Sequence, residues 1–382
     1  MSVENCRVCG NEFFQGHLLR LENIPATAQF FPDAIAIAAE KGVDLEVYQC
    51  SGCGLVQLNI DPVPYYKEVI RAAAFSREME VFRREQFKTF VKKYSLNGKK
   101  VVEIGCGRGE YLSLMQQSGV DAYGLEYSKE SVLHCEIMGL HVSNGFIQSS
   151  KDKLDFAPFD AFYILNFLEH VPDPNSTLRG IYNNLTEDAI GLVEVPNFDM
   201  IIRNNLFSEF IADHLFYFTR DTLSSTLGRN GYEIIECENI WHEYIISAVV
   251  RKKKKIDLSS FQKQQTDLKN EIDAYIGRFK GKRVAIWGAG HQALAIISLM
   301  GLSDKIKYVI DSAPFKQGKY TPATHIPIVA PDALNSDPVD AVIVMVASYS
   351  DEVIQIIRQK YNKNINVSVV RDFGLELVTP LS

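Results

Sequence analysis

The chain has 382 residues, of which 46% are apolar and 23% charged, and its formal net charge is −7. This length allows two or three domains with ample cores. The acidic balance excludes a general basic field that would attract nucleic acid or anionic membranes. No apolar run reaches the length of a membrane span, and the first ten residues lack a signal-peptide core. We therefore expect a cytoplasmic protein with no membrane or nucleic-acid partner.

Four of the seven cysteines form two C-x-x-C pairs, Cys6 with Cys9 and Cys50 with Cys53. Each such turn presents two thiolates on one side, and two turns complete the tetrahedron that Zn²⁺ prefers. The alternatives are two disulfides or a redox pair. A cytoplasmic location argues against disulfides, and redox chemistry needs no second pair. The pattern predicts a structural zinc site, because four thiolates leave no coordination position open for chemistry.

A helix predicted from about residue 76 to 94 precedes a short apolar run at residues 101–104, which is typical of a buried parallel strand. Gly105, Cys106 and Gly107 then form a turn, and Gly109 opens a helix. Glycine is required where the backbone bends sharply and approaches a ligand, and the helix N-terminus adds free N–H groups. Taken alone, this turn is a weak signal of a nucleotide site.

The following strands make that signal more specific. A second strand, residues 122–125, ends in Glu126, whose carboxylate can accept both hydroxyls of a ribose. A third segment ends near residues 144–146, and a fourth strand, 159–165, leads into the loop 166–174. The alternatives at this point are a nicotinamide-binding Rossmann unit or a non-catalytic nucleotide fold.

The ordered series resembles the class I S-adenosylmethionine (SAM) methyltransferases, in which an E-x-G-x-G-x-G turn is followed by an acid ending the second strand and by a loop after the fourth. The resemblance implies an α/β fold with a Rossmann-like sheet. It also implies a set of cofactor-binding residues: Glu103, Gly105, Cys106, Gly107, Gly109, Tyr111, Glu126, Asn166 and Leu168.

The whole chain further resembles the sugar C-methyltransferases of deoxysugar biosynthesis. Those proteins have a zinc-binding N-terminal domain, a SAM domain and a Rossmann-like C-terminal domain. The corresponding boundaries here are 1–75, 76–255 and 256–382. The resemblance implies methyl transfer to carbon of a nucleotide-linked keto-deoxysugar, which requires a base to form an enolate and a group to stabilise it.

That family carries a Y-H-E-H-x-x-Y-F-S stretch with acid/base groups near the sugar. Here His214 and Tyr217 match it, and Asp213 replaces the glutamate as a substrate-binding residue. Ile211 replaces the family's tyrosine, which puts its mechanism and substrate in doubt. We therefore expect His214 to be the base and His170 or Tyr217 the enolate stabiliser. Each of these side chains also has a structural alternative, as a satisfied core histidine, a loop residue or a packing tyrosine.

A basic run at residues 251–255 is expected to be a solvated linker, and a polar helix at 258–279 follows it. Next come a strand at 284–287, a turn with Gly288 and Gly290, and Asp311 after a further strand. Alone, this pattern is a fair dinucleotide fingerprint, so a working NAD site is one alternative. The family resemblance instead implies a substrate-binding domain, in which Gly288, Gly290, Lys316 and His325 bind the nucleotide side of the sugar.

Other functions stay open from the sequence. The acceptor could be an oxygen or nitrogen of a sugar or small molecule, because heteroatoms need less base catalysis than carbon. The cysteine turns could form a nucleic-acid-binding ribbon, although acidic residues crowd that region. The SAM pocket could also belong to an inactive binding protein. A monomer is plausible, because the three domains of one chain need no partner to complete a site.

Overall fold

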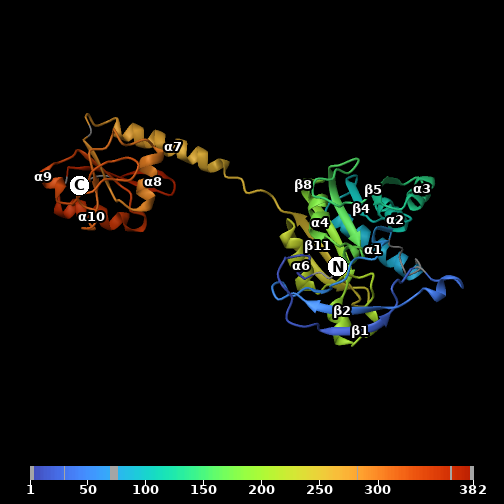
Figure 1. The fold of residues 1–382 in the computed structure, drawn as a ribbon. Coiled ribbons are helices and arrows are strands. Elements are labelled where there is room, and N and C mark those ends of the chain that lie inside the picture. The colour runs from blue at the N-terminus through green and yellow to red at the C-terminus, as the bar shows by residue number, and fades with distance from the viewer. Residues whose placement is uncertain (1–3, 30, 69–75, 282, 362–363, 379–382) are drawn as a thin grey trace. The chain divides into compact units, whose positions relative to one another are not determined.

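The computed structural model describes residues 4–29, 31–68, 76–281, 283–361 and 364–378. They form two compact units, Met1–Lys255 and Ile256–Ser382 (Figure 1). The predicted boundary between residues 75 and 76 falls at the edge of a segment outside the described residues. Within the described ranges, no helix is both long enough and apolar enough to cross a membrane.

A seven-stranded sheet forms the centre of the first unit, with the strand order β10-β11-β8-β7-β4-β5-β6. In chain order its strands are β4 (Lys100–Ile104), β5 (Asp121–Glu126), β6 (His141–Asn144), β7 (Phe159–Leu165), β8 (Leu185–Pro196), β10 (Tyr232–Ile240) and β11 (Ile245–Lys252). Strands β4 to β8 are parallel, and β11 and β10 add antiparallel to the β8 edge. The strand order reverses between β4 and β7, and ligands bind at the carboxyl ends of the strands beside such a reversal.

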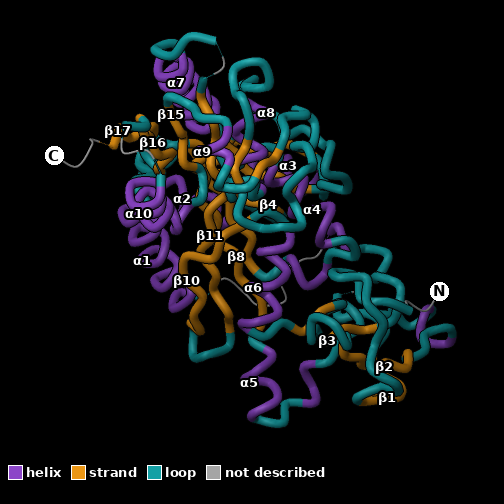
Figure 2. Tube along the Cα trace, turned by 90° about the vertical axis from the view of Figure 1, so that its left-hand side faces the viewer, coloured by secondary structure: helices purple, strands orange, loops and turns teal. Residues whose placement is uncertain are grey.

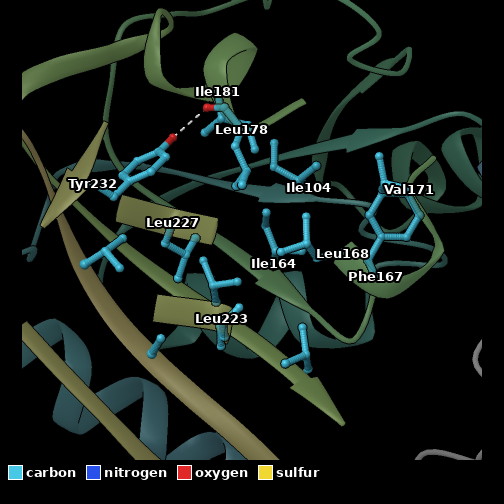
Figure 3. Close-up of a cluster of buried hydrophobic side chains, with 14 of the residues drawn as sticks. Ile104, Ile164, Phe167, Leu168, Val171, Leu178, Ile181, Leu223, Leu227 and Tyr232 are labelled. Carbon is cyan, nitrogen blue, oxygen red and sulfur yellow. Dashed lines mark hydrogen bonds between the residues drawn. The ribbon is translucent and has the colours of Figure 1, made fainter. Parts of the chain in front are cut away.

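Helices cover both faces of this sheet. One face packs against α1 (Arg77–Lys93), α2 (Glu110–Gln117) and α3 (Lys129–Ile137), and the other against α4 (Pro174–Tyr182) and α6 (Arg220–Arg229). In the second layer, Leu178, Leu223 and Leu227 pack against Ile164, and the Tyr232 hydroxyl donates to the Leu178 carbonyl oxygen at 2.9 Å (Figure 3). The predicted α/β fold is therefore confirmed.

Helix α1 begins where its sequence favours a start. The Ser76 hydroxyl accepts a hydrogen bond from the Met79 N–H at 3.1 Å, and Glu78 and Glu80 lie in the first turn. Both features stabilise a helix N-terminus, while Lys92 and Lys93 suit the negative end of the dipole. The capped helix presents Phe87 and Phe90 to the sheet.

A second, smaller sheet forms the N-terminal part of this unit and lies apart from the large sheet in Figure 2. Its strands are β1 (Leu19–Ile24), β2 (Val43–Gln49), β3 (Val56–Leu58) and β9 (Phe216–Tyr217), paired antiparallel in that order. It packs against α5 (Phe198–Arg203). Because β3 directly follows Cys53 and pairs with β9, the cysteine turns connect to the stretch that carries His214.

The basic run differs from its expected form. Arg251 and Lys252 belong to β11, and Lys252 is buried. Its Nζ donates to the Leu185 carbonyl oxygen at 3.0 Å and to Glu187 at 3.2 Å. The expected linker therefore begins only after this strand. Lys252 can be buried because its aliphatic stem covers apolar surface while its ammonium group reaches hydrogen-bond acceptors.

The second unit has its own sheet, in the order β14-β13-β12-β15-β16-β17. Its strands are β12 (Val284–Trp287), β13 (Val309–Ile310), β14 (Ile328–Val329), β15 (Ala341–Val344), β16 (Asn366–Arg371) and β17 (Gly374–Val378). All pair in parallel except β17. The helices are α7 (Ser259–Ile276), α8 (His291–Leu299), α9 (Ala333–Ser336) and α10 (Ser350–Lys360). The unit is therefore a second Rossmann-like α/β layer structure.

Candidate active site

The glycine turn after β4 has the backbone form that its sequence demands. Gly105, Gly107 and Gly109 have φ angles of 73°, 56° and 85°, a region that other residues rarely adopt. A Cβ atom on Gly107 would meet no atom within 4 Å, so a ligand has room to approach the backbone there. The turn therefore fits a bound nucleotide.

Two acidic side chains flank this turn. Glu103 is buried in β4 and accepts a hydrogen bond from the Tyr163 hydroxyl at 2.9 Å. Glu126 ends β5 and accepts the N–H groups of Gly107 and Ser128, both at 2.8 Å. Burial raises the pKa of Glu126, while the two N–H groups oppose that shift. The Glu126 carboxylate thus stands at the end of β5, beside the glycine turn.

A pocket joins Gly105 and Glu126 to residues that the sequence did not single out. Its lining is Lys67, Ile104, Gly105, Leu125, Glu126, Tyr127, Gly145, Phe146, Ile147, Phe167 and Thr177. The Phe167 ring covers Gly105, because a Cβ on this glycine would lie 3.1 Å from it. Lys67 places its ammonium group 5.1 Å from the Tyr127 ring centroid and 5.3 Å from that of Phe146. An aromatic wall of this kind suits the adenine end of a nucleotide.

The other predicted cofactor residues lie at different depths. Cys106 is buried, and its thiol and that of Cys135 both face the Gly107 carbonyl oxygen. Tyr111 is buried in α2. Asn166 directly follows β7 with a φ of 47°, and its Oδ1 is buried without a partner among the described residues. The Leu168 side chain packs into the core instead (Figure 3).

The predicted acid/base residues come together beside the same edge of the sheet. His170 lies in the single turn Leu168–His170 that follows β7, and His214 precedes β9. Their ring centroids are 4.7 Å apart at an angle of 72°. Burial lowers the pKa of His170 to about 4, and burial together with His170 lowers that of His214 to about 3. Both imidazoles are therefore neutral near pH 7.

Backbone and N-terminal groups hold this pair in place. His170 Nδ1 lies 2.7 Å from the Asp213 carbonyl oxygen. The Asp213 carboxylate accepts the Tyr65 hydroxyl at 2.9 Å and the Ala28 N–H at 3.3 Å. Asp213 therefore binds groups from the N-terminal segment, and no sequence spacing indicated Tyr65 as its partner.

One tyrosine, Tyr217, and one glutamate, Glu169, complete the cluster. The Tyr217 hydroxyl contacts the Ile211 backbone nitrogen at 3.1 Å and its carbonyl oxygen at 3.4 Å. Glu169 is fully buried, and burial raises its pKa to about 8. One oxygen of Glu169, together with a ring nitrogen of His170 and one of His214, falls within a 4.8 Å separation. No sequence motif indicated Glu169, because its position in the loop gave no signal.

The four cysteines of the two C-x-x-C turns gather as predicted. Their sulfur atoms all lie within 4.8 Å of one another, with 3.7 Å between Cys6 and Cys53 and 3.3 Å between Cys9 and Cys50. A tetrahedral site with Zn–S bonds of about 2.3 Å separates its sulfurs by about 3.8 Å. The N–H groups of Gly52 and Cys53 point at the Cys50 sulfur at 3.3 and 3.4 Å. The donor set fits a zinc ion.

Of the predicted residues of the second unit, Gly288, Gly290 and Lys316 lie around Asp311, and His325 does not. Its carboxylate accepts the Ala289 N–H at 2.9 Å, the Ala313 N–H at 2.9 Å and the Lys316 ammonium at 2.8 Å. This links Lys316 to the turn that contains Gly288 and Gly290. His325 is exposed and lies in a separate turn, where its N–H donates to the Thr321 carbonyl oxygen at 2.9 Å.

The reversing parallel sheet, the glycine turn and the carboxylate that ends β5 define a class I SAM-dependent methyltransferase. Comparison with known sequences agrees with this class. A family described as "Methyltransferase domain" matches residues 77–237, and one described as "C-methyltransferase C-terminal domain" matches residues 250–370. The chain belongs to the C-methyltransferase family that combines these two domains, and it is a SAM-dependent C-methyltransferase.

Individual relatives match this chain over different extents. The C-methyltransferase NovU of Streptomyces niveus is 22% identical over 92% of this chain and 91% of its own length. A ubiquinone biosynthesis O-methyltransferase of Aliivibrio fischeri is 30% identical over a match that covers 32% of this chain and 58% of that relative. The solved structure of a SAM-dependent methyltransferase from Clostridium acetobutylicum matches over 50% of this chain and 96% of its own chain, with 12% identity and a TM-score of 0.39.

Proposed function

We propose that this enzyme transfers a methyl group from SAM to carbon of a nucleotide-linked keto-deoxysugar, through an enolate of the sugar. The observation that carries the proposal is the contact between two neutral histidine rings, those of His170 and His214, at the carboxyl edge of the SAM domain. Carbon becomes a nucleophile only after it loses a proton, and a neutral imidazole is a base that can take it. The relationship to NovU along nearly the whole chain supports the same reaction class.

SAM supplies a methyl group that its sulfonium already activates, so the protein mainly has to align donor and acceptor and exclude water. The glycine turn would hold the cofactor, with Glu126 on the ribose and Asn166 near the methionine end. The Phe167 ring over Gly105 would help to exclude water from the pocket. Glu103, Cys106, Gly109, Tyr111 and Leu168 would shape or line the cofactor site.

His214 is the base in this proposal. Among the described residues no group hydrogen-bonds to its ring, and the residue is half-buried rather than fully buried, which leaves the ring available to a substrate proton. Its lowered pKa makes it a weak base in the free enzyme. An enolate forming beside it would favour the protonated ring and so strengthen it. A positioned base is worth about 10²–10⁴ in rate.

The enolate oxygen also needs a partner. His170 could serve in its protonated form, because its neutral form uses the Nδ1 proton on the Asp213 carbonyl oxygen. Tyr217 could serve only by giving up its contact with the Ile211 carbonyl oxygen. The lowered pKa of His170 disfavours its protonated form in the free enzyme, so either residue has to change its state before it can act as the stabiliser. Asp213 would then orient both the ring and the sugar.

We further propose that the two cysteine turns hold one structural zinc ion, which fixes β3 and, through its pairing with β9, the stretch that contains His214. The division into three domains, 1–75, 76–255 and 256–382, is part of the same proposal. In the C-terminal domain, Gly288, Gly290, Lys316 and His325 would bind the nucleotide part of the substrate. The Asp311 carboxylate already accepts three donors, which argues against its use as the ribose acid of an NAD site.

A second function keeps SAM but places the methyl on oxygen or nitrogen. The local similarity to an O-methyltransferase and the presence of Ile211 at the family's tyrosine position favour it. The histidine pair would then need only to remove a proton from a hydroxyl or amine.

A labelled-SAM assay in deuterated water, with a panel of nucleotide-linked 4-keto-deoxysugars, tests these functions. We expect methyl label on carbon and, in reactions without SAM, solvent deuterium at the carbon beside the ketone. His214→Asn should abolish both while SAM binding persists. Label on oxygen or nitrogen would support the second function. No transfer to any sugar, with SAM bound, would overturn the proposed substrate class.

A further inference from the structure

Glu169 is a buried acid without a balancing charge. Its side chain is 1% exposed, and its Oε2 has no hydrogen-bond partner among the described residues. No lysine or arginine of the described residues stabilises its ionised form, and burial raises its pKa to about 8. An unpaired carboxylate is costly where water is excluded. The carboxyl group therefore holds its proton near pH 7 and is a neutral O–H donor.

The proton of Glu169 has an open acceptor beside it. Nε2 of His170 lies 3.9 Å from Glu169 Oε1. The neutral His170 ring carries its own proton on Nδ1, which lies against the Asp213 carbonyl oxygen, so Nε2 is a bare acceptor. The separation is longer than a hydrogen bond, but catalytic hydrogen bonds are often long in ligand-free enzymes and shorten when substrate binds. An O–H donor and a bare nitrogen thus lie next to each other in a buried site.

The other acidic groups around Glu169 already have partners. The Tyr217 hydroxyl contacts a backbone carbonyl oxygen at 3.4 Å, and the Tyr244 hydroxyl donates to the Glu209 carboxylate at 2.8 Å. Burial raises the pKa of both tyrosines. The Asp213 carboxylate accepts two donors from the N-terminal segment. Within the described part of this cluster, Glu169 is therefore the acid whose proton is available.

The proposed reaction needs such a proton. When His214 takes the proton of the sugar, the enolate oxygen becomes negative and requires a donor. His170 in its neutral form has none to give, because its one N–H is used on the Asp213 carbonyl oxygen. Burial lowers the pKa of His170 to about 4 and keeps the ring neutral in the free enzyme. A negative oxygen nearby favours the protonated ring, so a buried proton source beside Nε2 completes the site.

We propose that Glu169 stores the proton that turns His170 into a cation when the enolate forms. The O–H bond of Glu169 breaks and the Nε2–H bond of His170 forms, and this N–H donates to the enolate oxygen. When the enolate carbon takes the methyl group, the ketone re-forms and the proton returns to Glu169. The proton on His214 leaves to solvent. The inference rests on the proposed function, and Glu169 is a positioning residue that acts through His170.

The charges in this step balance. In the free enzyme the acid and both imidazoles are neutral. At the enolate, cations on His170 and His214 face two anions, the Glu169 carboxylate and the enolate oxygen. No net charge enters the buried cluster, which limits the desolvation cost of the step. A proton taken from solvent instead would leave the cluster with an excess positive charge.

The pH dependence of solvent deuterium exchange tests this, with a nucleotide-linked 4-keto-deoxysugar and no SAM, from pH 6 to pH 9. In the wild type the rate should fall above pH 8, because Glu169 has then lost its proton. Glu169→Gln has no proton to transfer, so its exchange at pH 7 should be about 10- to 100-fold slower, without the fall near pH 8. Glu169→Asp keeps an acid and should keep the fall. Glu130→Gln, at an exposed position, should match the wild type.

A double variant tests whether Glu169 acts through His170. In His170→Asn the ring that receives the proton is absent. Adding Glu169→Gln to this variant should therefore slow exchange by about twofold or less, since residues that act as one unit are not additive. A purely structural role of Glu169 would slow exchange equally in both backgrounds and leave the alkaline fall in place.

The outcomes separate this role from the proposed function. An alkaline fall that persists in Glu169→Gln, or a full further loss in the His170→Asn background, would overturn the role of Glu169 alone. No exchange by the wild type at any pH would overturn the enolate reaction and this role with it. Circular dichroism checks the fold of each variant. If Glu169→Gln does not fold, Glu169→Asp carries the test, and the absence of an alkaline fall in both Glu169→Asp and the wild type would overturn the proposal.

Discussion

His170 is held by the backbone of the residue that precedes His214: its Nδ1 lies 2.7 Å from the carbonyl oxygen of Asp213. A carbonyl oxygen only accepts, so the neutral ring carries its proton on Nδ1 and leaves Nε2 bare. The same hydrogen bond connects the loop after β7 to the stretch before β9. This bond and the one from the Leu215 N–H to the Glu169 carbonyl oxygen, at 2.9 Å, together set the mutual position of the two histidines.

The first prediction separates that bond from the chemistry of the ring. In His170→Asn the amide nitrogen can replace Nδ1 and keep the bond to Asp213, whereas in His170→Gln it cannot reach the same place. If His170 acts on substrate through Nε2, both variants should lose about 10²-fold or more in kcat. If it only positions His214, the Asn variant should retain activity close to that of the wild type. Steady-state kinetics with unfolding temperatures as a control distinguish the two.

The second prediction concerns the pH dependence of stability. The pKa of Glu169 is raised to about 8 by burial, while an unfolded glutamate titrates near about 4.3. Between these values the folded protein holds a proton that the unfolded chain has released, so the free energy of unfolding falls as pH rises. Glu169→Gln cannot ionise and escapes that loss. The variant should gain stability relative to the wild type from pH 5 to pH 8, on the order of a few kcal/mol.

In both the wild type and Glu169→Gln, His170 and His214 change the stability with pH in the direction opposite to Glu169. Their pKa values are lowered by burial, so stability is complete above their ordinary pKa near about 6.5 and is lost as pH falls toward their folded values. Because the variant retains both rings, this contribution largely cancels in the difference. Denaturant unfolding of both proteins at pH 5 and pH 8 measures the difference in their free energies of unfolding. A difference that does not change with pH would contradict a protonated Glu169 in the folded state.

Several parts of this architecture were predictable from local spacing. The cysteine turns, the glycine turn and the acid that ends β5 each depend on neighbouring residues, and strand ends in a parallel sheet meet at one edge. The fold and the gathering of four cysteines followed from these features and are confirmed. The roles of the individual site residues stay predictions.

The unpredicted groups of the site come from distant segments. Tyr65 is 148 residues from its partner Asp213. No spacing rule joins such a pair, because the contact arises only when the N-terminal segment packs against the stretch before β9. The burial of Lys252 was missed for a similar reason, since its acceptors lie on a neighbouring strand.

The third prediction concerns the cysteine cluster. Cys53→Ser should remove one of four sulfur ligands and lower the zinc content from about one ion per chain, measured by mass spectrometry of metals. Cys237→Ser, on β10 and outside the cluster, is the matched control. Because Val56 pairs with Tyr217, loss of the metal should also reduce kcat more than SAM affinity. Full zinc content and full activity in Cys53→Ser would contradict a four-thiolate site.

The fourth prediction concerns the acid that ends β5. Glu126 accepts two backbone N–H groups and keeps the glycine turn close to β5. A carboxylate can accept both ribose hydroxyls, whereas an amide offers one acceptor oxygen and two donors. Glu126→Gln should therefore weaken SAM binding by about 10- to 100-fold, as expected for the loss of charged hydrogen bonds. It should also change the local turn, because one of the two N–H groups would face an amide nitrogen.

Glu130→Gln tests whether charge alone explains such a loss. Glu130 is exposed in the first turn of α3, and it carries the same charge near the same end of the sheet. Its substitution should leave SAM affinity within about twofold, because exposed charges are screened by solvent. Titration of both variants with SAM and with 5′-methylthioadenosine, which retains the ribose but lacks the amino-acid portion, completes the test. Equal weakening of the two ligands by Glu126→Gln places its effect on the ribose, and an effect on SAM alone would move that carboxylate's role to the methionine end.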